Sequence, residues 1–195
     1  MPGVGDGIGG SASVARGASL IKDGGFEKPV TPAGSFLVYG TGQNFAKWTV
    51  VGASGNVATV STTFVQNGYS FPAKSGKAWL DLTGISNTAT GVAQTIKTVA
   101  GTGYTVTFWV GNVSNSGGIF GTTSTVDVYD GTTLLSAATN SKGTGGTKQV
   151  WQKFTTSFVA TASKTTLSFV NGGRWQRHHC GLDAVSVVPA ALARR

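Results

Sequence analysis

Residues 104–111 read YTVTFWVG, and the alternation within this stretch decides the fold class. Its large apolar side chains recur at every second position, at Tyr104, Val106, Phe108 and Val110. Successive side chains of a β-strand point to opposite faces, so this spacing predicts a strand with one buried face and one face in water. Nowhere along the chain does the period of a helix persist for more than a turn or two.

Similar short runs lie on both sides of this stretch. Clusters of glycine, asparagine and serine separate them, which is the pattern of a β-sandwich or barrel. Asp130 and Gly131, between residues 126–129 and 132–135, predict a hairpin, because glycine accepts the positive φ that a two-residue turn requires. The clearest predicted strands cover residues 48–51, 57–60, 78–82, 91–96, 104–111, 125–129, 151–159, 165–170 and 182–188.

The composition supports the same fold class. Of the 195 residues, 30 are glycine and only 11% are charged, against about a quarter in an ordinary globular chain. Hydroxyl and amide side chains take the place of those charges, as in many secreted β-proteins. We therefore expect an all-β protein: one antiparallel β-sandwich at residues 19–189, with a flexible small-residue arm at 1–18 and a basic tail at 190–195.

The formal charge of +8, from 15 basic and 7 acidic residues, could attract nucleic acid, anionic envelopes or acidic polysaccharides. A nucleic-acid-binding protein gathers its basic residues on one element. Here the lysines are scattered, and the only clusters stand at residues 174–179 and 194–195. The sequence therefore argues against a nucleic-acid partner.

Cys180 is the only cysteine, so an intrachain disulfide is excluded, and a buried inert thiol is the simplest interpretation. No apolar run approaches the roughly 20 residues of a membrane helix, so we expect no membrane insertion. The first 20 residues have no apolar stretch of the signal-peptide type. We expect an extracellular or cell-surface protein whose signal has been removed, or alternatively a component of a virion.

Four segments stand in a fixed order along the chain: LIKDGGFEKP at 20–29, KWTVVG at 47–52, SGKAWLDL at 75–82 and GLDAVSVVP at 181–189. Their order resembles that of the secreted galactose-binding-like jelly-roll domains of bacterial carbohydrate-binding modules and plant cell-wall-associated proteins. The resemblance spans about residues 20–189. It implies a jelly-roll sandwich that binds a polysaccharide or another glycan.

The resemblance also implies a structural calcium ion where the last strand meets the opening segment. Its ligands would be Glu27 and Asp183, with Asp23 as a weaker third, since Ca²⁺ takes six to eight oxygen ligands. Two positions depart from the family pattern, because Asp23 and Ala184 stand where the family often has asparagine or a further acidic residue. The alternative is that Glu27 caps a backbone turn and Asp183 accepts backbone N–H bonds.

A basic, aromatic loop is one candidate ligand site, since sugar sites pair exposed rings with hydrogen-bonding groups. Residues 172–181 read GGRWQRHHCG, just before the last predicted strand. Loops at the end of a sandwich often carry binding residues. The alternative is a solvated basic loop whose tryptophan packs back on the sandwich. The candidate ligand-binding residues here are Trp175, Arg174, Arg177, Gln176 and His178.

Trp79 and Asp81 form a second candidate, because they share the strand face opposite Ala78, Leu80 and Leu82. If that face is in water, Trp79 beside Asp81 resembles a small sugar site. A weaker third group lies in two loops rich in glycine and asparagine: Tyr39, Tyr69 and Phe71. The tryptophans expected in the core are Trp48, Trp109 and Trp151.

The sequence shows no convincing catalytic or zinc constellation. Glycoside hydrolysis typically needs two carboxylates across a cleft, and the seven acids offer no clear pair. No nucleophile elbow of the GxSxG type is present. Zinc at His178, His179 and Cys180 is disfavoured, because adjacent side chains of an extended chain point to opposite faces.

Two non-enzymatic functions follow from these observations. The first is an extracellular carbohydrate-binding module for cell-wall or surface polysaccharide. The second is a structural or adhesive subunit of a surface layer, filament or phage particle, which would self-associate through its sandwich and its N-terminal arm.

Overall fold

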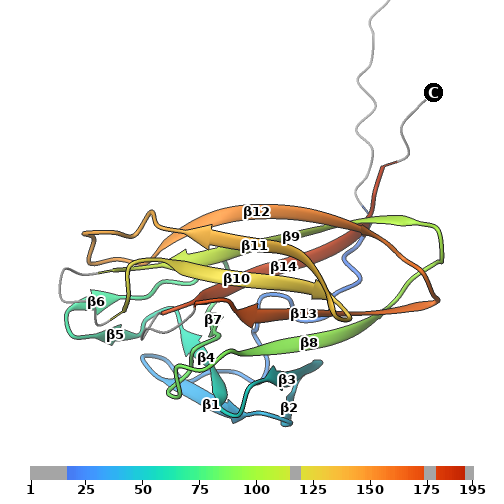
Figure 1. Cartoon of the computed structure of the whole chain (residues 1–195). Coiled ribbons are helices and arrows are strands. Elements are labelled where there is room, and N and C mark those ends of the chain that lie inside the picture. The colour runs from blue at the N-terminus through green and yellow to red at the C-terminus, as the bar shows by residue number, and fades with distance from the viewer. Residues whose placement is uncertain (1–16, 115–119, 174–178, 192–195) are drawn as a thin grey trace, which may run out of the picture.

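The computed structural model describes residues 17–114, 120–173 and 179–191, and within them two six-stranded antiparallel sheets face each other (Figure 1). We call them sheet A and sheet B. Sheet A has the order β1 (Phe36–Gly40), β4 (Asn56–Ser61), β7 (Ala78–Asp81), β14 (Gly181–Pro189), β9 (Gly103–Asn112) and β12 (Val150–Val159). Sheet B has the order β11 (Thr133–Asn140), β10 (Ser124–Asp130), β13 (Lys164–Asn171), β8 (Thr90–Lys97), β3 (Trp48–Gly52) and β2 (Asn44–Phe45).

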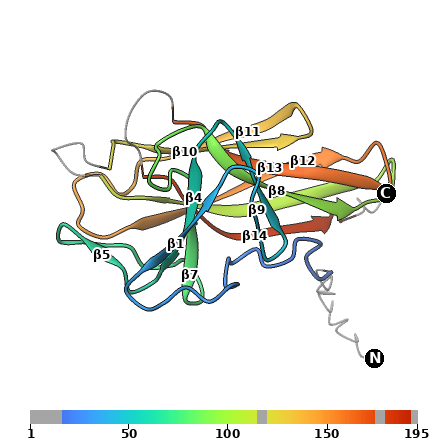
Figure 2. The same ribbon diagram turned by 90° about the horizontal axis from the view of Figure 1, so that it is seen from below.

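A two-stranded hairpin, β5 (Val65–Gln66) and β6 (Tyr69–Ser70), lies outside the two sheets. In Figure 2, β5 projects at one end of the sandwich, and β4 and β7 run steeply across the direction of the long strands. All nine predicted strands are present, each within two residues of its predicted ends. The all-β jelly-roll sandwich is confirmed. The short strands β1, β2, β5 and β6 were not predicted, since none carries a clear alternation.

The predicted hairpin is correct in place and shifted by one residue in register. Strand β10 includes Asp130, which pairs with Thr133, so the two-residue loop consists of Gly131 and Thr132. Gly131 has a φ of 57°, the left-handed conformation that the sequence assigned to it.

The core between the sheets comes from the alternating positions of their strands. In β9, Tyr104, Val106, Phe108 and Val110 are all buried, as the sequence predicts. Trp48, in β3, is fully buried as expected, and its ring lies 5.3 Å from that of Phe26 by centroid. Full burial of a large apolar side chain contributes about 1.5–3 kcal/mol.

The segment 19–28 closes one side of the sandwich by bonding to both sheets. The Leu20 amide donates to the Val187 carbonyl at 2.8 Å in sheet A, and the Val185 amide donates to the Gly24 carbonyl at 2.8 Å. On the other side, the indole Nε1 of Trp48 donates to the Asp23 carbonyl at 2.9 Å. The opening and closing segments therefore lie side by side.

A second, smaller apolar cluster covers the outer face of sheet A. Trp151, predicted in the core, lies in this outer cluster instead and donates from Nε1 to the Pro72 carbonyl at 2.8 Å. Trp109 is also outside the core: it is partly exposed, and Lys74 Nζ lies 4.3 Å from its ring centroid. Trp109 in β9 and Trp151 in β12 both occupy outward positions of their strands. The alternation within each strand therefore overrides the general preference of tryptophan for the core.

No helix among the described residues is long and apolar enough to cross a membrane.

Candidate functional site

Strands β1, β4 and β7 bring two rows of side chains to the outer face of sheet A. In one row Phe36 lies opposite Val60, and Val60 lies opposite Trp79. In the next row Ala58 lies opposite Asp81. Strand register alone thus places Trp79 and Asp81 on a common floor.

A pocket of about 270 Å³ opens on this floor. The loop that follows β7 forms one wall, and aromatic side chains from residues 64–71 and 120 form the other. Its lining residues are Phe36, Ala58, Val60, Phe64, Gln66, Phe71, Trp79, Asp81, Thr83, Gly84, Ile85, Asn87, Phe120 and His179.

Trp79 forms part of the pocket, but it is not an exposed platform. Only 1% of its surface is accessible. Its Nε1 donates to the Phe71 carbonyl at 2.9 Å, and the rings of Trp79 and Phe71 stack with centroids 6.3 Å apart. Trp79 and Asp81 therefore share a strand face, as predicted. The condition attached to a sugar site there, that this face be in water, is not met at Trp79, because the outer aromatic cluster covers its ring.

Of the described residues that line the pocket, Asp81 is the only acidic one, and none is a lysine or an arginine. Its Oδ1 accepts hydrogen bonds from Thr83, at 3.0 Å from the amide and 2.6 Å from the hydroxyl. Burial raises the pKa of Asp81 to about 6, although the hydrogen bonds from Thr83 favour the carboxylate. At neutral pH Asp81 is thus largely an anion that can accept hydrogen bonds from a ligand.

His179 lies at the inner end of the pocket and is held neutral. Burial lowers its pKa to about 3. Its Nε2 is hydrogen-bonded to the Gln149 side chain, whose Nε2 donates to the Pro72 carbonyl at 3.1 Å. The ring also meets Trp79 edge to face at 5.1 Å. These contacts give His179 a packing role and leave it uncharged across the physiological pH range.

The other predicted ligand groups separate in the structure. Tyr69 packs edge-on against Phe120 at 5.2 Å and does not line the pocket. Phe71 lines it, whereas Tyr39 stacks on Phe45 at 4.3 Å, away from the site. The predicted loop residues Arg174, Trp175, Gln176, Arg177 and His178 lie outside the described residues.

Several pocket residues were not predicted. Phe36, Thr83 and Asn87 come from β1 and from the loop after β7, and none belongs to a recognisable motif. The pairing of β1 with β4, and of β4 with β7, brings Phe36 to Trp79, whereas Thr83 and Asn87 reach the pocket in the loop that directly follows Asp81.

The three predicted calcium ligands gather at the junction of the opening and closing segments. Asp183 is fully buried; its Oδ2 accepts from the amides of Lys74 and Ser75 at 2.9 and 3.1 Å, and its Oδ1 accepts from the amide of Ala184. Burial raises the pKa of Asp183 to about 7, and the nearby charge of Glu27 adds to that rise.

Glu27 and Asp23 also bind backbone amides. Glu27 Oε1 accepts from Lys77 at 2.9 Å, and Asp23 Oδ1 accepts from the Glu27 amide at 2.9 Å. Among the described residues, no group of three or more acidic, histidine or cysteine side chains is arranged to hold a metal ion. The bonds that Glu27, Asp23 and Asp183 accept from backbone amides are those of the turn-anchoring alternative, and a calcium ion bound with the help of backbone carbonyls and water stays a prediction for experiment.

Cys180 is buried, and its Sγ lies 3.2 Å from the Thr125 carbonyl. Burial raises the pKa of this thiol, so it stays protonated and unreactive.

Residues 19–188 match the model of a family described as a protein of unknown function, DUF642. No curated protein matches the sequence. The match covers nearly the whole sandwich, including the opening and closing segments and the pocket. It agrees with the resemblance inferred from the ordered motifs.

Three solved structures place the fold among known proteins. A cyclase from Fischerella sp. TAU has a TM-score of 0.61 at 18% identity, over 90% of this chain and 98% of that chain. An arabinose-bound α-L-arabinofuranosidase has a TM-score of 0.53 at 16% identity, over 88% of this chain and 26% of that chain. The CBM22-1 xylan-binding domain of Xyn10C from Paenibacillus barcinonensis has a TM-score of 0.48 at 16% identity, over 84% and 99%. The first two likenesses establish a shared fold.

Proposed function

The chain belongs to the DUF642 family, and from its pocket we propose that it is a non-catalytic module that binds a neutral sugar unit of a cell-wall or surface polysaccharide. One observation carries the proposal. Among the residues that the structure describes, the pocket on sheet A combines aromatic walls with a single hydrogen-bonding carboxylate, Asp81, and no cationic side chain.

The chemistry of the pocket suits a sugar ring. Apolar C–H faces of a sugar pack on aromatic side chains, and sugar hydroxyls need hydrogen-bonding partners. Phe36 and Phe64 supply aromatic surface, and Asp81, Asn87 and Gln66 supply carboxylate and amide groups. A volume of about 270 Å³ is at the small end for ligand pockets, so a single terminal or branching sugar fits better than a chain.

The described part of the pocket does not contain the pair of carboxylates that glycoside hydrolysis typically uses. Asp81 is the only carboxylate among the described lining residues. His179 is neutral and engaged with Gln149, so it is poorly suited to accept a proton at neutral pH. These features support binding without catalysis.

Retention in affinity electrophoresis gels that contain neutral plant or bacterial polysaccharides tests the proposal. Phe36→Ala and Asp81→Asn should each abolish the retardation that the unaltered protein shows. Val38→Ala is the matched control, since Val38 is exposed to the same extent as Phe36 (39% and 38%) on the same strand but does not line the pocket. If Phe36→Ala and Asp81→Asn bind as well as Val38→Ala, the pocket is not the site.

The proposal includes an extracellular location at a cell wall or cell surface. Its support is the association of the DUF642 family with plant cell walls. Fractionation of the source cells with an antibody to the chain tests it, and recovery of the protein in the cytosol alone would contradict it.

A structural or adhesive subunit is the second candidate. The part of its argument that rested on residues 1–16 lies outside the described residues. One observation favours it: β1 is an edge strand of sheet A, and Phe36 and Val38 are exposed on it. An open edge of this kind can pair with a second copy. Size-exclusion chromatography with light scattering separates the candidates, because the sugar-binding module should be monomeric.

A further inference from the structure

A basic groove lies on the other sheet, where β3 leaves part of β8 uncovered. Strand β3 pairs with β8 only as far as Thr49 opposite Ala93, so residues 94–97 have no strand neighbour on that side. The opening segment runs beside them, because the Gln94 side chain bonds both the amide and the carbonyl of Lys22, at 2.8 and 2.9 Å. The space between forms a groove of about 880 Å³.

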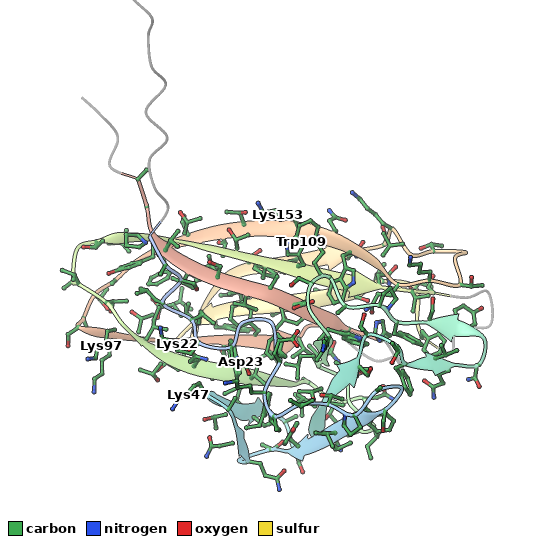
Figure 3. The ribbon with its side chains drawn as sticks, turned by 180° about the vertical axis from the view of Figure 1, so that it is seen from behind. Lys22, Asp23, Lys47, Lys97, Trp109 and Lys153 are labelled. Atoms are coloured by element: carbon green, nitrogen blue, oxygen red, sulfur yellow. The ribbon has the colours of Figure 1, made fainter. Side chains whose placement is uncertain are left out.

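Three exposed lysines, Lys22, Lys47 and Lys97, line this groove, and none of its described lining residues is acidic. Figure 3 shows them on the same side of the molecule, with Asp23 nearby. Asp23 is not among the lining residues, and its carboxylate accepts hydrogen bonds from the amides of Glu27 and Lys28.

The lysines are left without carboxylate partners. Among the described residues, none of the three lies within 4.0 Å of an acidic oxygen. At the end of β8, Lys97 lies directly opposite Lys164 of β13, so two like charges share one face of sheet B. Like charges in this arrangement destabilise a sheet. A bound polyanion would relieve that repulsion.

The side chains on the floor of the groove indicate which class of polyanion it could bind. Beside the lysines it presents the hydroxyl residues Thr49, Thr95 and Thr166, and the Thr95 and Thr166 hydroxyls lie 2.7 Å apart. In the part of the chain that the structure describes, no aromatic or arginine side chain lines it. Single-stranded nucleic acid is bound largely by base stacking on aromatic rings, which this floor lacks. Ammonium groups beside hydroxyls suit a chain of sugars that carry carboxylates.

We propose that the groove between the opening segment and β8 binds a uronate-bearing polysaccharide through Lys22, Lys47 and Lys97. This site is separate from the pocket of sheet A. The groove is lined by three lysines, whereas the pocket contains a carboxylate. The pocket would hold a neutral sugar, and the groove would hold an acidic chain. Neither proposal depends on the other.

Titration calorimetry with polygalacturonate tests the groove. Each lysine-to-glutamine change should weaken binding about two- to fivefold, the range for an exposed ion pair, and the triple variant Lys22→Gln/Lys47→Gln/Lys97→Gln should weaken it at least about tenfold. Binding by the unaltered protein should also fall steeply as NaCl is raised from about 50 mM to about 500 mM, because salt screens exposed charges.

A second triple variant controls for net charge. This variant changes three exposed lysines outside the groove to glutamine: Lys142, Lys148 and Lys153. It lowers the net charge by three, as the groove variant does. Figure 3 shows Lys153 on the far side of the molecule from Lys47. The control should keep most of the affinity, and both triple variants should keep the melting temperature of the unaltered protein.

Three results would overturn the proposal. The first is no binding of polygalacturonate; the second is an equal loss in both triple variants, which would indicate net charge alone. The third is equally strong binding of single-stranded DNA or of anionic lipid vesicles, which would remove the assignment to uronate. Retention of the groove variant on neutral polysaccharide, and of Asp81→Asn on polygalacturonate, distinguishes failure of one site from failure of the other.

Discussion

The pH dependence of stability should report directly on the environment of Asp81. Burial raises its pKa from 3.8 to about 6 in the folded protein. The folded state therefore holds this proton more tightly than the unfolded state, so its contribution to stability is full below pH 4. That contribution is lost as the pH rises through about 6.

The size of the effect follows from the same pKa. At about 1.4 kcal/mol for each pKa unit, the change from 3.8 to about 6 corresponds to about 3 kcal/mol. Asp81 borders the pocket and is only partly buried, so solvent screening should leave about 2 kcal/mol. Asp81→Asn removes the titration, and its amide oxygen can still accept the bonds from Thr83.

Urea unfolding of the unaltered protein and of Asp81→Asn between pH 4 and pH 8 measures this difference. The two free energies of unfolding should diverge by about 2 kcal/mol between pH 4 and pH 7, with the unaltered protein losing more. Contributions from other acids, including Asp183, cancel in the comparison. Curves that stay parallel within about 0.5 kcal/mol would refute the claim that burial governs Asp81.

Four further measurements follow from the structure. Trp79→Ala should lower the free energy of unfolding by about 3–5 kcal/mol because it empties a fully packed site, and a loss near zero in chemical denaturation would contradict the burial of the ring. Since burial lowers the pKa of His179 to about 3, its ring should not titrate in NMR spectra between pH 5 and pH 8; a midpoint near 6.5 would mean that it is exposed. Gly91→Ala should be strongly destabilising in thermal unfolding, because the new Cβ would lie 2.2 Å from the Phe169 carbonyl oxygen, whereas Gly103→Ala, with its nearest contact at 3.6 Å, should be tolerated. EDTA should leave the melting temperature unchanged if Glu27 and Asp183 serve only to anchor backbone turns; a rise with CaCl₂ that Glu27→Gln abolishes would instead establish the calcium site.

Sequence and structure agree best where a side chain's neighbours follow from strand periodicity. The buried face of β9 and the shared face of Trp79 and Asp81 both follow from the two-residue repeat. Exposure does not follow from it, because the repeat says which side a residue faces and not what covers that side. The sequence therefore placed Trp79 correctly on its strand and left its exposure open, and the structure shows the ring to be buried.

The calcium prediction shows the same limit at another junction. The sequence brought Glu27 and Asp183 together through the order of the motifs, and the two do lie within electrostatic range of each other. Their hydrogen-bond partners, the amides of residues 74–78, come from a distant loop. No local sequence pattern predicts those partners, so the sequence could not decide between a calcium site and the anchoring of backbone turns.

Spacing along the chain was enough to predict the all-β class, nine of the strands, the hairpin at Gly131 and the family. The two candidate sites depend instead on tertiary contacts. The pocket requires the order β1-β4-β7. The groove requires that β3 pair with β8 only as far as Ala93, and that Lys22 be held against Gln94. Contacts between residues far apart in the chain create both surfaces, and such contacts exist only once the two sheets have packed.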